Sequence, residues 1–387
     1  MRTSAMFALS LCLGYSSYIQ AQDWKNECVG YYQMQLPDNL EVALYPVDLI
    51  VDPLKDPGWT KDGPITRYLF PRISFSDNRD QDNNDRVQSQ FSQFYYRDYK
   101  VNISSESNAP IDFQHHENEF RARIDFDIQT YWNRRDHRLS LGLRVLSKEQ
   151  AEQFVEYRID NFPDAFLFSK FSGYSAVINK SNRLYIFNLI NRTYTLDDQL
   201  KTSRPEAIAL LKQFQPRKLY EVPKEQGFCL PYGFIAGDSG HEKRNMAVTY
   251  RLKEHPDVTI FFQDLGTSPG PGERRPDESM DAKRYVTHFW TKRYGHAFRE
   301  MQLNGKGFSS PKVDNRKGVA AFTRFIRRSK EVDYGYMAFV KGNSDNNEPD
   351  LIFYVVRDSR QAKGHPPMDK DKLEKMAEHI ISTVKHR

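Results

Sequence analysis

The 387-residue sequence lacks the motifs by which many enzymes and nucleic-acid-binding proteins are identified. No Gly-x-Ser-x-Gly motif occurs, so the sequence does not predict a hydrolase nucleophile of that type. The Pro/Gly-rich residues 266–273 are not followed by Gly-Lys-Ser/Thr, and their prolines remove backbone donors, which excludes a phosphate-binding loop there. A formal net charge of only +5, from 56 basic and 51 acidic residues mixed along the chain, argues against binding to nucleic acid.

Long apolar runs are absent after the first twenty residues, so no membrane-spanning segment is expected in the rest of the chain. The start has the order of a secretory signal peptide: Arg2, an apolar segment over residues 5–14, and the small Ala21 before a polar stretch. We predict that residues 1–21 are a signal peptide cleaved near Ala21. A membrane anchor is the alternative, and lipidation of Cys12 is disfavoured because the bulky Leu11 precedes it.

Cysteine is also scarce, with three residues in the chain. Cleavage near Ala21 removes Cys12 and leaves Cys28 and Cys229, an even number in an oxidising compartment, so we expect a disulfide between them. The two cysteines enclose about 200 residues, and the chain-entropy estimate for such a bridge is roughly 5 kcal/mol. Two buried thiols that stay unpaired are the alternative.

The sequence is rich in Tyr and Phe, with 22 and 26 residues, in alternating patterns typical of β-strands. Its length exceeds one ordinary hydrophobic core and predicts two domains, which we place at residues 22–218 and 219–387. We expect an α+β fold in which each domain is a mainly antiparallel sheet with a few covering helices. The expected strands are residues 28–37, 41–47, 91–101, 119–129, 174–178, 184–190, 246–252, 258–262, 319–328, 334–341 and 350–357.

Helices are expected where capping residues or apolar periodicity favour them. Ser147 and Gln150 have the spacing of a capping box, which predicts a helix over residues 147–157. A second helix opens at Arg204-Pro205 and runs to Phe214, and a third is expected over residues 285–294. Residues 369–384 predict an amphipathic helix with an inward face formed by Leu373, Met376, Ala377, Ile380, Ile381 and Val384.

Candidate catalytic and metal-binding residues are few. His115-His116-Glu117 is the best metal-like cluster, but neighbouring residues of a strand point to opposite faces, so both imidazoles are not expected to bind one ion. The polar residues 76–86 lack the Gly and Glu of a calcium loop. Residues 237–241 match the Gly-Asp-Ser-Gly order of a chymotrypsin-like protease without the Ala-Ala-His-Cys segment upstream, and a polar turn is favoured. We predict no catalytic residue, no metal site and no cofactor.

Two motifs at the starts of the predicted domains share a layout, in which a cysteine, glycine and aromatic residues lead into a strand and a Pro-containing turn. They read Glu27-Cys28-Val29-Gly30-Tyr31-Tyr32 with Leu36-Pro37 and Glu41-Val42, and Gly227-Phe228-Cys229-Leu230-Pro231-Tyr232-Gly233-Phe234-Ile235-Ala236 with His255-Pro256-Asp257-Val258. Through these motifs the sequence resembles the type VI secretion immunity proteins, in particular the family that neutralises an antibacterial phospholipase effector of the α/β-hydrolase type.

The resemblance implies a periplasmic protein that is not an enzyme and whose partner is the cognate phospholipase effector. We also expect no nucleic acid partner, no stable membrane insertion and a monomer before binding. Two domains would clamp the lid region of the effector, because a hydrolase that depends on lid motion is silenced when a partner holds one lid state. A Cys28 to Cys229 disulfide would limit the interdomain freedom that is lost on binding.

Contact residues are expected in the loops 77–86 and 266–280, which we place beside the cleft between the domains. Asp80, Asp82, Arg274 and Arg275 are the candidates, since Arg is favoured at interface hot spots. A solvated surface role is the alternative for the arginine pair. Two other functions stay open: a periplasmic hydrolase with an unrecognised site, and an envelope lipid-binding protein.

Overall fold

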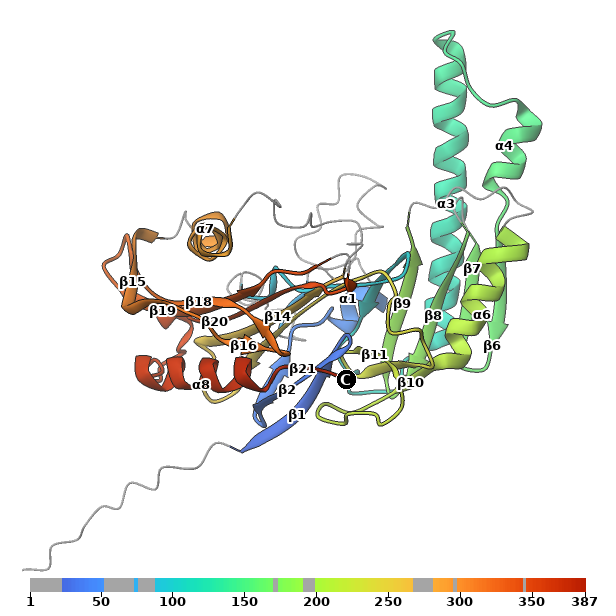
Figure 1. Ribbon diagram of the computed structural model, residues 1–387. Helices are drawn as coiled ribbons and strands as arrows, with labels where there is room; N and C mark the ends of the chain where they lie inside the picture. The colour runs from blue at the N-terminus through green and yellow to red at the C-terminus, as the bar shows by residue number, and fades with distance from the viewer. Residues whose placement is uncertain are drawn as a thin grey trace, which may run out of the picture.

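The computed structural model describes residues 23–51, 73–75, 88–169, 173–190, 199–266, 281–294, 298–343 and 346–387 (Figure 1). Its main feature is an antiparallel sheet of thirteen strands covered by a few helices, so the expected α+β class is confirmed. Across the sheet the order is β15 (Phe298–Ser309), β18 (Val319–Arg327), β19 (Val332–Val340), β20 (Asp350–Arg357), β14 (Val258–Leu265), β13 (Arg244–Leu252), β4 (Gln93–Tyr96), β5 (Tyr99–Ile103), β9 (Arg183–Leu189), β8 (Tyr174–Lys180), β7 (Ala165–Ser169) and β6 (Arg158–Phe162), with β3 (Leu40–Val42) also paired to β13.

Smaller elements surround this sheet. β1 (Trp24–Val29), β2 (Tyr32–Pro37) and β21 (Lys385–His386) form one three-stranded sheet, so segments from the two ends of the chain lie side by side. A second small sheet has the order β10 (Phe214–Pro216), β12 (Gly233–Ala236) and β11 (Gly227–Leu230). The remaining short elements are α1 (Val47–Val51), β16 (Lys312–Val313), β17 (Arg316–Lys317), the π-helix Gln199–Ser203 and the 3₁₀ helix Ser359–Gln361.

The large sheet is continuous across residue 218, where the domain boundary is predicted. β13 pairs with β14 along one edge and with β3 and β4 of the N-terminal half along the other. All nine residues of β13 are buried, as expected for a strand with both faces covered. The division into two domains stays a prediction, and the backbone hydrogen bonds of β13 link the two halves.

Most strands predicted from alternation are present. Residues 246–252 and 258–262 form the hairpin β13–β14, and residues 174–178 and 184–190 form the hairpin β8–β9. The C-terminal runs form β18, β19 and β20. The predicted strand 41–47 is too long, because β3 ends at Val42 and Val47 begins α1.

Two of the predicted strands are each a hairpin. Residues 91–101 divide into β4 and β5 at Arg97, which has a φ of 51°. Residues 28–37 divide at Gly30, with a φ of 60°, into the end of β1 and β2. A Cβ at Gly30 would lie 2.7 Å from Asp264 Oδ2, so both the backbone conformation and the close approach require glycine there.

Two predicted helices cover opposite faces of the C-terminal part of the sheet (Figure 1). α7 (Ala282–Tyr294) packs against β18 and β19, and α8 (Lys370–Thr383) packs against β19 and β20. Neighbouring residues of β20 alternate between the two cores: Ile352 joins the core that contains α7, and Phe353 joins the core that contains α8. The inward residues predicted for α8 are all buried.

The strand predicted over residues 119–129 is wrong, because these residues lie in α3 (Phe113–Ser140). Phe120 and Ile124 fit a spacing of two, but they fit a helical spacing of four equally well, and alternation alone does not separate the two. Packing decides for the helix, since the Phe120 ring lies 5.5 Å from Phe166 and 5.0 Å from Phe168 of β7. The predicted helix α6 (Arg204–Gln213) is present and packs against β8.

α3 and α4 (Lys148–Val155) form the α3–α4 arm, residues 113–155, which projects from the sheet (Figure 1). The predicted capping box of α4 is confirmed: Gln150 N donates to Ser147 Oγ at 3.2 Å, and Ser147 N donates to Gln150 Oε1 at 3.1 Å. The buried side chains of α3 are those of His116, Glu117, Phe120 and Ile124. Phe113 and Ile128 also pack against the core while partly exposed, so α3 extends beyond the core only after Ile128.

Candidate functional site

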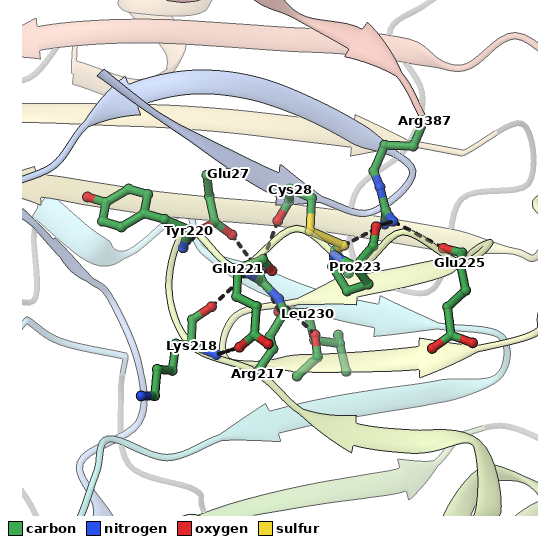
Figure 2. Close-up of a disulfide and its surroundings, with 12 residues drawn as sticks. Glu27, Cys28, Arg217, Lys218, Tyr220, Glu221, Pro223, Glu225, Leu230 and Arg387 are labelled. Atoms are coloured by element: carbon green, nitrogen blue, oxygen red, sulfur yellow. Dashed lines mark hydrogen bonds and ion pairs between the residues drawn. A yellow bond between two sulfur atoms is a disulfide. The ribbon is translucent and has the colours of Figure 1, made fainter. Parts of the chain in front are cut away.

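The disulfide between Cys28 of β1 and Cys229 of β11 joins the two segments that carry the shared sequence motifs (Figure 2). It is present in the structure as the sequence predicts, with a Cα to Cα distance of 5.8 Å. The segments also pair through their backbones, because Gly30 and Cys229 exchange two N–H to C=O hydrogen bonds of 2.9 Å. We call this region, with the side chains described next, the disulfide junction. It fastens the first hairpin of the chain to the first hairpin of the second half.

A buried ion pair between Arg217 and Glu27 lies beside the disulfide (Figure 2). The two side chains are 2% and 0% exposed. The Arg217 guanidinium also donates to backbone carbonyls, including Cys28 O at 3.1 Å and Leu230 O at 3.0 Å, and Tyr220 N donates to Glu27. A buried charge is costly unless it is paired and hydrogen-bonded, and here both charges are.

Arg387 closes the other side of the junction (Figure 2). Its Nη1 lies 2.8 Å from Cys229 Sγ, its Nη2 donates to Pro223 O at 2.5 Å, and its backbone N–H donates to Tyr31 O at 2.9 Å. Arg387 thereby contacts the segments around both cysteines. The junction is a structural element, since the charged groups of Glu27, Arg217 and Arg387 are bonded within the protein.

The Gly-Asp-Ser-Gly segment supports the same region and does not form a nucleophile and base. Asp238 is buried and accepts hydrogen bonds from Tyr31 Oη at 2.6 Å and Tyr96 Oη at 3.2 Å. Burial raises the pKa of both tyrosines, and the Asp238 carboxylate raises it further, so both act as neutral donors. Ser239 Oγ donates to Glu242 and accepts from the His241 backbone N–H at 3.2 Å, whereas the His241 ring contacts Asn347. The imidazole is therefore not placed as a base for the serine hydroxyl.

The His115-His116-Glu117 cluster lies on α3, where His116 turns into the core and His115 is exposed. His116 packs among aromatic rings, at 5.3 Å from Phe120 and 6.4 Å from Phe166. Burial, with the positive charges of neighbouring groups, lowers the pKa of His116 to about 3. Across the described residues, no group of three or more His, Cys, Asp or Glu side chains is placed to hold a metal ion.

The residues predicted to contact a partner cannot be placed on this structure. Asp80 and Asp82, as well as Arg274 and Arg275, lie outside the described residues. Between the two halves the structure does contain an open polar pocket of about 290 Å³. It is lined by Arg97, Asp98, Tyr99, Glu206, Glu242 and Lys243. Its charged lining suits contact with a polar partner surface.

An exposed apolar surface at the end of the α3–α4 arm escaped the sequence analysis. Within the described parts of the chain, seven large hydrophobic side chains are exposed, and five of them are on the arm. The sequence signal was present as alternating leucines between arginines, but it carries no meaning until α3 is recognised as a helix. The five are Leu139 (46% exposed), Leu141 (60%), Leu143 (47%), Leu146 (43%) and Phe154 (38%).

Neither the arm nor any other described helix has the length and apolar composition needed to cross a bilayer.

Comparisons with known proteins identify one segment of the sequence and the fold. Residues 221–311 match the family model described as the Tle cognate immunity protein 4 C-terminal domain. No curated protein matches the chain.

Solved structures match nearly the whole chain. The immunity protein TplEi of the T6SS from Pseudomonas aeruginosa, complexed with "L" peptide, gives a TM-score of 0.50 at 16% identity, covering 94% of this chain and 98% of that chain. A chain of the Tle4–Tli4 complex gives 0.52 at 17% identity, with 94% and 97% covered, and the apo structure of TplEi gives 0.50 at 16%, also with 94% and 97% covered. The chain therefore has the fold of these solved structures, and its residues 221–311 are similar to the Tle cognate immunity protein 4 C-terminal domain, in agreement with the resemblance carried by its motifs.

Proposed function

We propose that this chain is a type VI secretion immunity protein that binds a cognate phospholipase effector and inhibits it. The family match over residues 221–311 carries the proposal, because that family is named for immunity to Tle effectors. The fold adds support, since the matched solved structures include TplEi with "L" peptide and the Tle4–Tli4 complex.

Inhibition would work by holding the lid region of the effector between the two halves of the chain. The disulfide junction and the continuous β13 favour this mechanism, because a frame that is already rigid loses little freedom when it binds. Holding one lid state removes the motion by which lipid enters an active site of this type. Arg274 and Arg275 remain the proposed contacts, with Asp80 and Asp82.

The protein would act in the periplasm as a binding protein without catalytic activity, after removal of residues 1–21. The disulfide supports an oxidising compartment, because such bonds persist there and are rare in reducing ones. The engaged side chains of the Gly-Asp-Ser-Gly turn support a role without catalysis. We further propose that it is a monomer until it meets the effector.

The test is capture of an effector from periplasmic extract with residues 22–387, followed by an assay with a soluble short-chain ester. We expect one captured lipase whose activity falls linearly with added protein and vanishes at a 1:1 ratio. Arg275→Glu should weaken inhibition at least tenfold, whereas Arg144→Glu on the exposed arm, a matched charge reversal, should leave it unchanged. Absence of a stoichiometric partner, together with lipid hydrolysis by the chain alone, would favour the hydrolase alternative instead.

A further inference from the structure

The end of the α3–α4 arm combines exposed leucines with exposed positive charge. Residues 134–148 contain four leucines, five Arg or Lys residues and one acidic residue. All four leucines are exposed, and so are Arg134, Arg138 and Arg144. Among the described residues, none of these three arginines forms an ion pair, so their charge is directed to solvent. We call residues 134–148 the arm tip.

The arm holds this tip well away from the rest of the protein (Figure 1). Ile128 is the last residue of α3 that packs against the core, and the helix continues to Ser140. Twelve residues of helix add about 18 Å at 1.5 Å per residue. The tip is therefore the far end of a rigid projection and can touch a surface that the body of the protein does not approach.

Contacts within the arm fix the tip without covering its leucines. The Tyr131 ring packs 5.3 Å from Phe154, Arg135 Nη2 donates to Leu146 O at 3.2 Å, and the capping box starts α4. Gly142 turns the chain at the end of the arm with a φ of 68°, and nothing lies within 4 Å of the position of a Cβ there. Leu141 and Leu143 are thus presented on either side of an open, convex turn.

We propose that the arm tip binds the surface of an anionic lipid bilayer, with its leucines in the interface and its arginines at the lipid phosphates. The turn at Gly142 is open, and the pocket beside the tip is lined by Trp132, Lys148 and α4 and by none of the four leucines. The leucines are therefore presented outside that pocket, and leucines beside arginines suit the boundary between acyl chains and headgroups. The acidic side chains Glu149, Glu152 and Glu156 follow in α4, which runs back toward the body. This arrangement is peripheral binding and needs no spanning helix.

The biological role that we give to lipid binding rests on the proposed function. The binding of lipid by the arm tip does not depend on that function. A phospholipase acts on a bilayer, so an inhibitor held at that surface would meet it in two dimensions. Attachment at the tip would leave the large sheet and the disulfide junction clear of the membrane. Both the lipid contact and the effector contact could then be made at once.

The test is co-sedimentation of residues 22–387 with vesicles of phosphatidylethanolamine and phosphatidylglycerol, compared with phosphatidylcholine vesicles. We expect binding to the anionic vesicles that weakens as salt rises, because charge supplies part of it. Leu141→Asp with Leu143→Asp, and separately Arg138→Glu with Arg144→Glu, should each reduce the partition coefficient at least tenfold. The matched control is Leu303→Asp in β15, where the leucine is 41% exposed, and it should bind like the wild type.

Circular dichroism and the melting temperature should be the same for all variants, since every replaced side chain is exposed. The proposal is overturned if the wild type does not bind anionic vesicles or if both tip variants bind as it does. It is also overturned if the tip variants lose inhibition of the effector on a soluble ester, because the tip would then belong to the effector interface. Failure of the wild type to inhibit any lipase would instead count against the proposed function and leave the vesicle result standing.

Discussion

The disulfide junction and the α3–α4 arm distribute polar and apolar groups in opposite ways. At the junction, charged groups are buried and paired, as Arg217 and Glu27 are, beside a disulfide and the backbone hydrogen bonds between Gly30 and Cys229. On the arm, leucines are exposed, and the second half of α3 has no buried side chain. The charged groups of the junction are bonded within the protein, whereas the leucines of the arm are available to a binding partner or a membrane.

This difference separates the part of the chain that sets shape from the part that is presented to a surface. A frame that binds with little loss of freedom needs long-range links, and the junction joins segments about 200 residues apart. An exposed apolar patch lowers solubility and is retained in a folded protein mainly where it binds a partner or a membrane. Variants with substitutions in the disulfide junction alone, or in the α3–α4 arm alone, will test whether the two regions have these different roles.

The largest expected effect is that of removing the disulfide. Cys28→Ser with Cys229→Ser should lower the free energy of unfolding by roughly 5 kcal/mol at most, because the bridge closes a long loop in the unfolded chain. Urea denaturation at pH 7 under non-reducing conditions measures it. Wild type denatured in urea with reductant should have the same free energy of unfolding as the variant. A loss below 1 kcal/mol would mean that the paired hairpins hold the junction without the bond.

Next in size is the loss of the buried cation. Arg217→Met should cost about 3–5 kcal/mol, because it leaves the Glu27 carboxylate buried without its partner. Adding Glu27→Gln to that variant should recover part of the loss, since no buried charge is then unpaired. Arg144→Met on the arm, a matched change at an exposed position, should stay within about 0.5 kcal/mol of wild type. Equal losses in the two single variants would contradict the contrast between the regions.

The junction was more open to sequence reasoning than the arm. Two cysteines after a predicted signal peptide leave one pairing, and the first motif has a glycine, Gly30, where its turn needs a positive φ. In the second motif the residue with positive φ is Tyr232, which the sequence pattern does not reveal. The buried partners of Arg217 were not predictable, because they depend on a register between residues 190 positions apart. Local patterns thus identified the bond, and only the fold identified the charge network.

The α3–α4 arm shows why apolar residues at every second position of a short segment do not distinguish a strand from a helix. Phe120, Ile124 and Ile128 recur at every fourth residue, and this spacing also satisfies alternation. The capping box of α4 was predicted correctly because it depends on local hydrogen bonds alone. The exposure of the arm tip could not be predicted, because it follows from how far α3 continues past the core.

A pH-dependent effect probes the base of the arm, where α3 enters the core. His116 is buried and its pKa is lowered to about 3, so the unfolded chain, with an ordinary pKa near 6.5, takes up the proton first as pH falls. Wild-type stability should therefore fall by about 1.4 kcal/mol per pH unit below 6.5 relative to His116→Phe. The free energy of unfolding of wild type minus that of His116→Phe should therefore be lower at pH 4.5 than at pH 7 by roughly 2–3 kcal/mol.

Urea denaturation of wild type and His116→Phe at these two pH values measures the difference in their free energies of unfolding. The contributions of titrating groups that both proteins contain cancel in this difference. His137→Phe is the matched control, since His137 is exposed near the end of the same helix, and its stability should follow wild type at both pH values. A His116→Phe variant that lost stability with pH exactly in parallel with wild type would mean that His116 accepts a proton in the folded state.

The smallest effect is expected where the arm stands clear of the core. Ser147→Ala removes the Oγ atom that accepts a hydrogen bond from Gln150 N, whereas the bond from the Ser147 backbone N–H to Gln150 Oε1 does not need the hydroxyl. The change should destabilise α4 by about 1 kcal/mol. Because α4 buries only Ala151 and Val155, the loss should appear as local opening. Amide hydrogen exchange in residues 148–155 should quicken about fivefold while exchange in β13 stays unchanged. Ser140→Ala removes a hydroxyl that donates to His137 O in α3 and takes no part in the capping box of α4, so it should leave both rates as they are. A lowered global melting temperature for Ser147→Ala would show that the arm and the frame unfold as one unit, and the contrast between them would then hold for their surfaces only.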